Sequence, residues 1–240
     1  MGKYYYLMSL LPSLPETLGD PLPDGLDRLA QLARRNVEPG DSDLLELLLA
    51  QIDIVNYINQ QTGRDIFLPG GSIMETDLKE NRNLSPDIKE FLRQPEVSRP
   101  FVYDRLWEIY LSRTLQKAEK LGNKFLKKYL PWEIQLRNAL ATMRAVQAGL
   151  EPSLYLARAG GEAYDLTPLL TVLKDCPGPL EAELYLDRER LKFVSACLDF
   201  DRFSLDALLG YLAQAMIFWR WENLKKPYDL NKITIAGGIK

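Results

Sequence analysis

The sequence predicts an all-α protein, an elongated bundle of helices with little or no strand. Three observations favour this class: long stretches with apolar residues at helical spacing, prolines and glycines between these stretches, and few alternating β-branched segments. Only the tail, ITIAGGIK, alternates in that way. We expect one helical domain over 1–240, with possible sub-bundles at 1–95, 96–175 and 176–240.

The first half of the chain contains three predicted helices. Residues 24–36 and 41–63 have leucine or isoleucine at helical spacing, and each segment begins at an aspartate, a preferred N-cap residue. Ser85-Pro86 opens a short helix, because proline is favoured in the first helical turn. Residues 64–84 are expected to be irregular.

The second half is also mostly helical. Residues 101–129 contain no helix breaker except Gly122, so we predict one helix, about 43 Å long at 1.5 Å per residue. Pro131 is expected to kink or restart it, and the helix then runs to Gly149. The remaining predicted elements are two short helices in 151–174, a turn at 176–179, a charge-rich helix at 180–200 and a last helix at 204–226.

The composition argues against several kinds of chemistry. The chain has no histidine, which excludes Ser-His-Asp and Cys-His nucleophile pairs and histidine-containing zinc sites. Its two cysteines, Cys176 and Cys197, are too few for a four-cysteine zinc site and are interpreted as free, partly buried thiols. We expect no catalytic centre, no metal and no cofactor. A net charge of −3 does not favour a nucleic-acid partner.

The sequence does not predict a membrane-inserted protein. The most apolar stretch, 204–219, contains Asp206 and Gln214 and is shorter than the roughly 20 residues that a membrane-spanning helix needs. The N-terminus has one lysine and a short apolar run ended by prolines, which is not typical of a signal peptide. We therefore expect a soluble protein that can still dock on a membrane complex.

One self-similarity indicates a helical repeat. The segment DIVN at 53–56 precedes Gly70-Gly71, and the segment RWEN at 220–223 precedes Gly237-Gly238. The separation from asparagine to the first glycine is 14 residues in both cases. A third asparagine, Asn138, follows a similar helical segment without a glycine pair at that spacing. The alternative is coincidence, because asparagines and glycine pairs are common.

We interpret the polar residues of these segments as structural. Asp53 and Asn56 are expected to cap or link neighbouring helices, and Gly70 and Gly71 to supply turns with positive φ. Glu133 and Arg137, spaced i and i+4, are expected to form a largely buried ion pair that orients packed helices. A catalytic carboxylate with an arginine clamp is the alternative, and it needs a second carboxylate and a cavity. Asn138 and Asn223 complete the structural set.

Basic residues recur along the predicted 101–129 helix in steps of three and four, which places them on one face. The simplest interpretation is a solvated helix face, and the alternative is a docking surface for an acidic partner or for anionic lipid headgroups. The five residues are Arg113, Lys117, Lys120, Lys124 and Lys127.

Three segments together resemble the C/d family of V/A-type rotary ATPase components, whose members join the rotor ring to the central shaft. They are the aromatic run Tyr4-Tyr5-Tyr6-Leu7, the helix with Asp53 and Asn56 followed by Leu68-Pro69-Gly70-Gly71, and the helix with Glu133, Leu136-Arg137 and Asn138. The opening KYYYLMSLLPSL is also similar to a shorter bacterial family of unknown function, whose genes tend to lie among those for this ATPase.

The resemblance implies an all-helical body of three related bundles with a funnel shape. It also implies a non-catalytic role, linking the central shaft to the membrane rotor ring, and a cytoplasmic location at the inner membrane through the ATPase complex. The chain is shorter than the usual family member, which implies that one bundle is trimmed or fused. An assembly or regulatory factor of the same complex is the alternative, and an enzyme that uses only carboxylates and arginine is least favoured.

Overall fold

The computed structural model describes residues 3–93, 100–157, 160 and 162–224. In these residues the protein forms ten α-helices and one 3-10 helix, without a strand, so the predicted all-α class is confirmed. The tail ITIAGGIK lies outside the described residues. The α-helices are α1 (Tyr5–Leu10), α2 (Leu26–Asn36), α3 (Ser42–Gln61), α4 (Glu75–Lys79), α5 (Pro86–Arg93), α6 (Tyr103–Lys120), α7 (Lys124–Gln147), α8 (Thr167–Lys174), α9 (Pro179–Cys197) and α10 (Leu205–Leu224), and η1 (Pro152–Tyr155) is the 3-10 helix.

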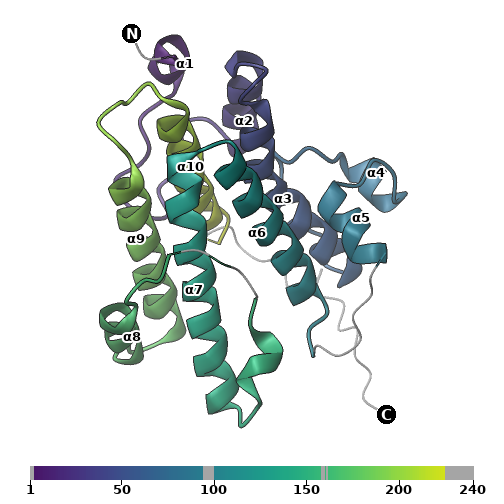
Figure 1. Ribbon diagram of the computed structural model, residues 1–240, viewed down its shortest axis with the longest axis vertical. Helices are drawn as coiled ribbons and strands as arrows, with labels where there is room; N and C mark the ends of the chain where they lie inside the picture. Colours follow the sequence, from purple (N-terminus) through teal and green to yellow (C-terminus); the bar gives the residue numbers. More distant parts are fainter. Residues whose placement is uncertain (1–2, 94–99, 158–159, 161, 225–240) are drawn as a thin grey trace.

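The long helices pack as successive pairs: α2 with α3, α6 with α7, and α9 with α10. Figure 1 shows α6 and α7 in the centre, with α8 and α9 on one side and α4 and α5 on the other. The main apolar core runs from Tyr4 to Phe218 and takes residues from all three predicted sub-bundles. A smaller cluster around Trp132 joins α7 to α8 and α9. The sub-bundles therefore share one main core.

The predicted single helix over 101–129 is wrong, because the chain reverses direction inside it. α6 ends at Lys120, and Gly122 adopts a φ of +69°, the left-handed conformation that commonly ends a helix. The Asn123 side chain then caps α7 by accepting a hydrogen bond from the backbone N–H of Leu126 at 2.8 Å. Pro131, expected to kink or restart the helix, lies inside α7 without ending it.

The other predicted helices are confirmed with small changes of boundary. They correspond to α2, α3, α5, α9 and the described part of the last helix, α10. The two short helices expected in 151–174 are η1 and α8. Two further helices, α1 and α4, were not predicted, because they have six and five residues and are too short to have a clear apolar period. Both cysteines are free, Cys197 being buried and Cys176 partly buried.

Replacing Gly122 by alanine tests this reversal. We expect Gly122→Ala to lower the free energy of unfolding by about 1 kcal/mol, because a Cβ disfavours the left-handed conformation. An added Cβ at Gly122 would meet no atom within 4 Å, so only the backbone penalty is measured. Gly40→Ala is the matched control, because its Cβ is equally free and no positive φ is required. Equal stability of the two variants in urea unfolding would contradict the assignment.

Candidate functional site

Two asparagines fasten the extended segments that follow long helices. Asn56 on α3 donates a hydrogen bond to the carbonyl of Leu68 at 2.9 Å and accepts one from the Leu68 N–H at 2.7 Å. Asn138 on α7 makes the same pair of bonds with Ala157, at 2.9 and 2.8 Å. Each side chain therefore satisfies both backbone hydrogen-bonding groups of one residue in a segment outside any sheet.

The residue three positions before each asparagine binds the same segment further along. Asp53 is buried and accepts hydrogen bonds from the backbone N–H groups of Ser72 and Ile73 at 3.0 and 3.1 Å. Burial raises the pKa of Asp53, although these two N–H groups act in the opposite direction. Gln135 on α7 binds the backbone of Glu162 and Tyr164. The same arrangement therefore occurs at α3 and α7, whereas the repeat inferred from the sequence paired the α3 segment with 220–223 and included Asn138 only as a third, incomplete match.

We call a long helix together with the extended segment that follows it a unit, so that α3, α7 and α10 begin the first, second and third units. The two glycines of the first unit, Gly70 and Gly71, have different roles. Gly70 has a φ of +99°, as expected. Gly71 has no such φ, so its predicted role is wrong: it is needed for close approach, because an added Cβ would lie 2.1 Å from Oδ1 of Asp53.

The third unit is described only in part. On α10, Arg220 and Asn223 have the same three-residue spacing as the corresponding residues of α3 and α7. The Asn223 side chain donates to the carbonyl of Trp219 at 2.7 Å. Gly237 and Gly238, which completed the predicted repeat, lie outside the described residues.

Glu133 lies at the centre of a network of ion pairs that joins α7 to α9. Its carboxylate is buried and accepts hydrogen bonds from Nε of Arg137 at 2.8 Å and from Nε of Arg190 at 3.0 Å. Burial alone would raise the pKa of Glu133, but the charges of Arg190 and Arg137 lower it below the ordinary value. Arg137 is 37% exposed, so the expectation that it is largely buried is wrong, and Arg190, at 15%, is the more buried partner.

The network continues from α9 to α10. Arg190 also binds Asp187 at 2.8 Å, and Asp187 accepts hydrogen bonds from Arg220 at 2.6 Å and from the indole N–H of Trp221 at 2.7 Å. Arg220 reaches Glu183 on the same face of α9. Three arginines and three carboxylates therefore connect α7, α9 and α10.

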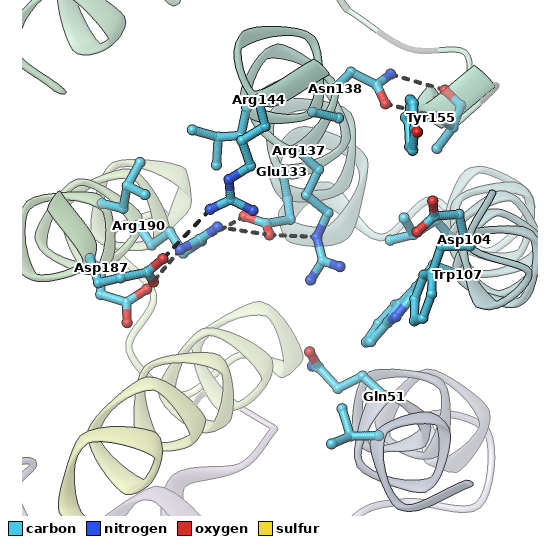
Figure 2. A pocket seen from close by; sticks show the side chains of 18 of the residues that line it. Gln51, Asp104, Trp107, Glu133, Arg137, Asn138, Arg144, Tyr155, Asp187 and Arg190 are labelled. Carbon is cyan, nitrogen blue, oxygen red and sulfur yellow. Dashed lines mark hydrogen bonds and ion pairs between the residues drawn. The ribbon is translucent and has the colours of Figure 1, made fainter. Parts of the chain in front are cut away.

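A cavity of about 790 Å³ opens beside this network (Figure 2). Its walls come from α3, α6, α7, α9 and α10, which include helices of all three units. Trp107 on α6 forms part of the wall, and the guanidinium carbon of Arg137 lies 4.5 Å from the centre of its ring, a cation–π contact. Arg144, 72% exposed, lines the cavity two helical turns beyond Arg137.

The five predicted basic residues do not form one stripe, because the helix that should carry them is two helices. Arg113 and Lys117 on α6 pair with Asp87 at 3.2 Å and with Asp43 at 2.8 Å. The other three lie around the turn between α6 and α7, where Lys124 pairs with Asp199 at 3.2 Å. In the part of the chain that the structure describes, Lys120 and Lys127 are exposed and neither has an ion pair.

Sequence reasoning missed four residues of this site: Trp107, Gln135, Asp187 and Arg190. Asp187 and Arg190 could have been noticed, because they are spaced i and i+3 on the charge-rich helix. Their pairing with α7 has no local signal, because Arg190 lies 57 residues from Glu133. Within the described residues, no group of three or more possible ligands could hold a metal ion, and no helix is long and apolar enough to cross a membrane.

The fold and the site define an all-helical protein. Asparagine side chains bind the extended segments that follow two of its long helices, and the helix pairs surround an arginine-lined cavity. The family model DUF2764, described as a protein of unknown function, matches residues 1–229, so the chain belongs to this family. Comparison with curated proteins and with solved structures gives no match.

The two arginine partners of Glu133 should differ in their effect on stability. We expect Arg190→Ala to lower the free energy of unfolding by about 3–5 kcal/mol, because it removes the buried partner of two buried carboxylates. Arg137→Ala should cost about 1 kcal/mol or less, because Arg137 is partly exposed and Arg190 remains on Glu133. Urea unfolding of both variants measures the difference, and equal losses would contradict the assignment of Arg190 as the central partner.

Proposed function

We propose that this protein is a non-catalytic coupling component of a V/A-type rotary ATPase, linking the central shaft to the membrane rotor ring. The observation that carries the proposal is that all three segments responsible for the resemblance make hydrogen bonds that hold helices and their connecting segments together. Asn56 and Asn138, from the second and third segments, hold the extended segments after α3 and α7. These contacts support the proposal, because the resemblance implies a body built from related helical units.

The first segment joins the beginning and the end of the described chain. Tyr4 is buried, its hydroxyl binds Asp41 before α3, and its backbone N–H donates to the carbonyl of Phe203 at 2.8 Å. The ring of Tyr5 packs on that of Phe203, with centroids 4.8 Å apart. The N-terminal aromatic run thus connects the start of the chain both to the residue before α3 and to the loop between α9 and α10, so the first segment of the resemblance also has a structural role.

The carboxylates of the cavity favour a structural role over catalysis. The alternative interpretation of Glu133 needed a second carboxylate and a cavity, and the structure contains both, in Asp187 and the space beside it. However, each carboxylate accepts hydrogen bonds from two arginines. The pKa of Glu133 is lowered, whereas a general acid or base working near neutral pH needs a raised carboxyl pKa.

The exposed lysines at the turn between α6 and α7 are the best candidates for contact with an acidic partner protein. Arg113 and Lys117 are already engaged by carboxylates of α5 and α3. Lys120 and Lys127 are exposed and are not required for these contacts. The predicted five-residue docking surface is thereby reduced to one end of the helix pair.

Purification from cells distinguishes the proposed coupling component from its alternative, an assembly or regulatory factor of the same ATPase. We expect the tagged full chain to copurify with the intact complex at one copy per complex. An assembly factor would be recovered only with subcomplexes. Recovery of no ATPase protein under conditions that preserve the intact complex would contradict both versions.

Charge reversal tests the reduced docking surface. We expect Lys120→Glu combined with Lys127→Glu to weaken association with reconstituted shaft–ring subcomplexes at least tenfold, more strongly at low ionic strength because salt screens exposed charges. Lys89→Glu with Lys174→Glu is the matched control: both lysines are exposed, on α5 and α8, and the change in net charge is identical. Unchanged binding, or equal weakening in the control, would contradict a local docking role.

A further inference from the structure

The cavity has the dimensions of a small-molecule site. Its volume of about 790 Å³ falls within the roughly 300–1,000 Å³ typical of pockets that bind small ligands. Such pockets combine apolar walls with a few convergent polar groups. Here Val55 on α3 and Met216 and Ile217 on α10 line one part of the cavity, and arginines of α7 line another.

Arg137 presents an unused hydrogen-bonding edge to this cavity. Its inner nitrogen, Nε, donates to Glu133, and its guanidinium is held against the ring of Trp107. In Figure 2 the outer end of the guanidinium, with both terminal amino groups, points away from Glu133 into the open space. Among the described residues, no hydrogen bond or ion pair reaches these two amino groups.

The surroundings of Arg137 keep this edge available for an anion. Glu133, its acidic partner, also binds Arg190, and Arg190 binds Asp187 as well, so the two arginines share two carboxylates. Both carboxylates lie on the inner side of Arg137, away from its outer edge (Figure 2). Arg144 also lines the wall formed by α7. It pairs with Glu183 at 3.8 Å, a longer distance than the 2.8 Å between Arg137 and Glu133. A guanidinium edge with two amino groups matches the paired oxygens of a carboxylate or a phosphate.

We propose that the cavity binds a small organic anion. Its carboxylate or phosphate group lies on the outer edge of Arg137, and its apolar part lies against Val55, Met216 and Ile217. Trp107 holds the guanidinium in position, so little side-chain freedom is lost when the anion binds. This ligand site is separate from the lysine surface at the turn between α6 and α7 and does not depend on the ATPase proposal.

Four matched probes test the site by calorimetry on the full chain: hexanoate, hexyl phosphate, hexanol and inorganic phosphate. We expect saturable binding of hexanoate or hexyl phosphate, at least tenfold tighter than that of hexanol, which lacks the charge, and of phosphate, which lacks the apolar part. The tighter of the two anions identifies the head group as carboxylate or phosphate. Absence of saturable binding by both anions, or equal binding of hexanol, would overturn the proposal.

A pair of arginine variants locates the binding. Arg137→Gln should weaken binding of the preferred anion at least tenfold, because it removes the charge and the two-nitrogen edge. Arg28→Gln should leave the affinity unchanged: Arg28 also pairs with an acid four residues earlier, Asp24 at 3.0 Å, but it is 75% exposed on α2 and does not line the cavity. Equal affinity of Arg137→Gln and the parent would overturn the proposal.

The parent protein gives an independent readout that needs no folded Arg137 variant. Of the indole N–H resonances of the four tryptophans, the one lost in Trp107→Phe identifies Trp107. We expect this resonance to move with saturation as the anion is added. Trp132 is buried outside the cavity lining, so its resonance should stay in place. An anion that moves only the Trp132 resonance binds elsewhere, and the proposal fails.

Discussion

The buried carboxylate of Glu133 needs positive charge from another helix, and the centre of the molecule depends on that requirement. Arg137 comes from the same helix, α7, and is partly exposed, so it neutralises the carboxylate only in part. Arg190 approaches from α9 and binds Asp187 as well. Because Asp187 in turn holds α10, one buried charge sets the relative positions of three helices and the shape of the cavity beside them.

A second constraint concerns the backbone outside the helices. In an all-α protein the connecting segments have no sheet to satisfy their N–H and C=O groups, so those groups that are buried from water need side-chain partners. Asn56 and Asn138 bind both groups of one residue each, and Asp53 and Gln135 bind the same segments further along. The two units use different residues at the second position, so the shared feature is the spacing and not the residue type.

The sequence predicted what depends on local physics. Apolar spacing located α2, α3, α5, α9 and α10, because this signal acts within a few residues. Ser85 and Ser204 cap α5 and α10, whereas the aspartates expected to cap α2 and α3 make no cap hydrogen bond, and the N-cap of α2 is Gly25. Near the middle of the chain the sequence contains two residues that can end a helix, Gly122 and Pro131. Gly122, in the left-handed conformation and followed by the cap residue Asn123, separates α6 from α7, whereas Pro131 lies inside α7. The site was less predictable: Glu133 was identified, but its buried partner lies 57 residues away, and that pairing exists only after the chain has packed.

The two asparagine-fastened units differ in how far the helix extends beyond the asparagine. α3 continues from Asn56 to Gln61, whereas α7 continues from Asn138 to Gln147, about one turn further. The returning segment is correspondingly longer, reaching back to residue 157 from Asn138 but only to residue 68 from Asn56. Because the attachment point stays fixed, the distal tip can gain or lose a whole turn without altering the register of the core. Insertions and deletions in proteins of this architecture should therefore accumulate at these tips, as about one helical turn together with a returning stretch of similar length.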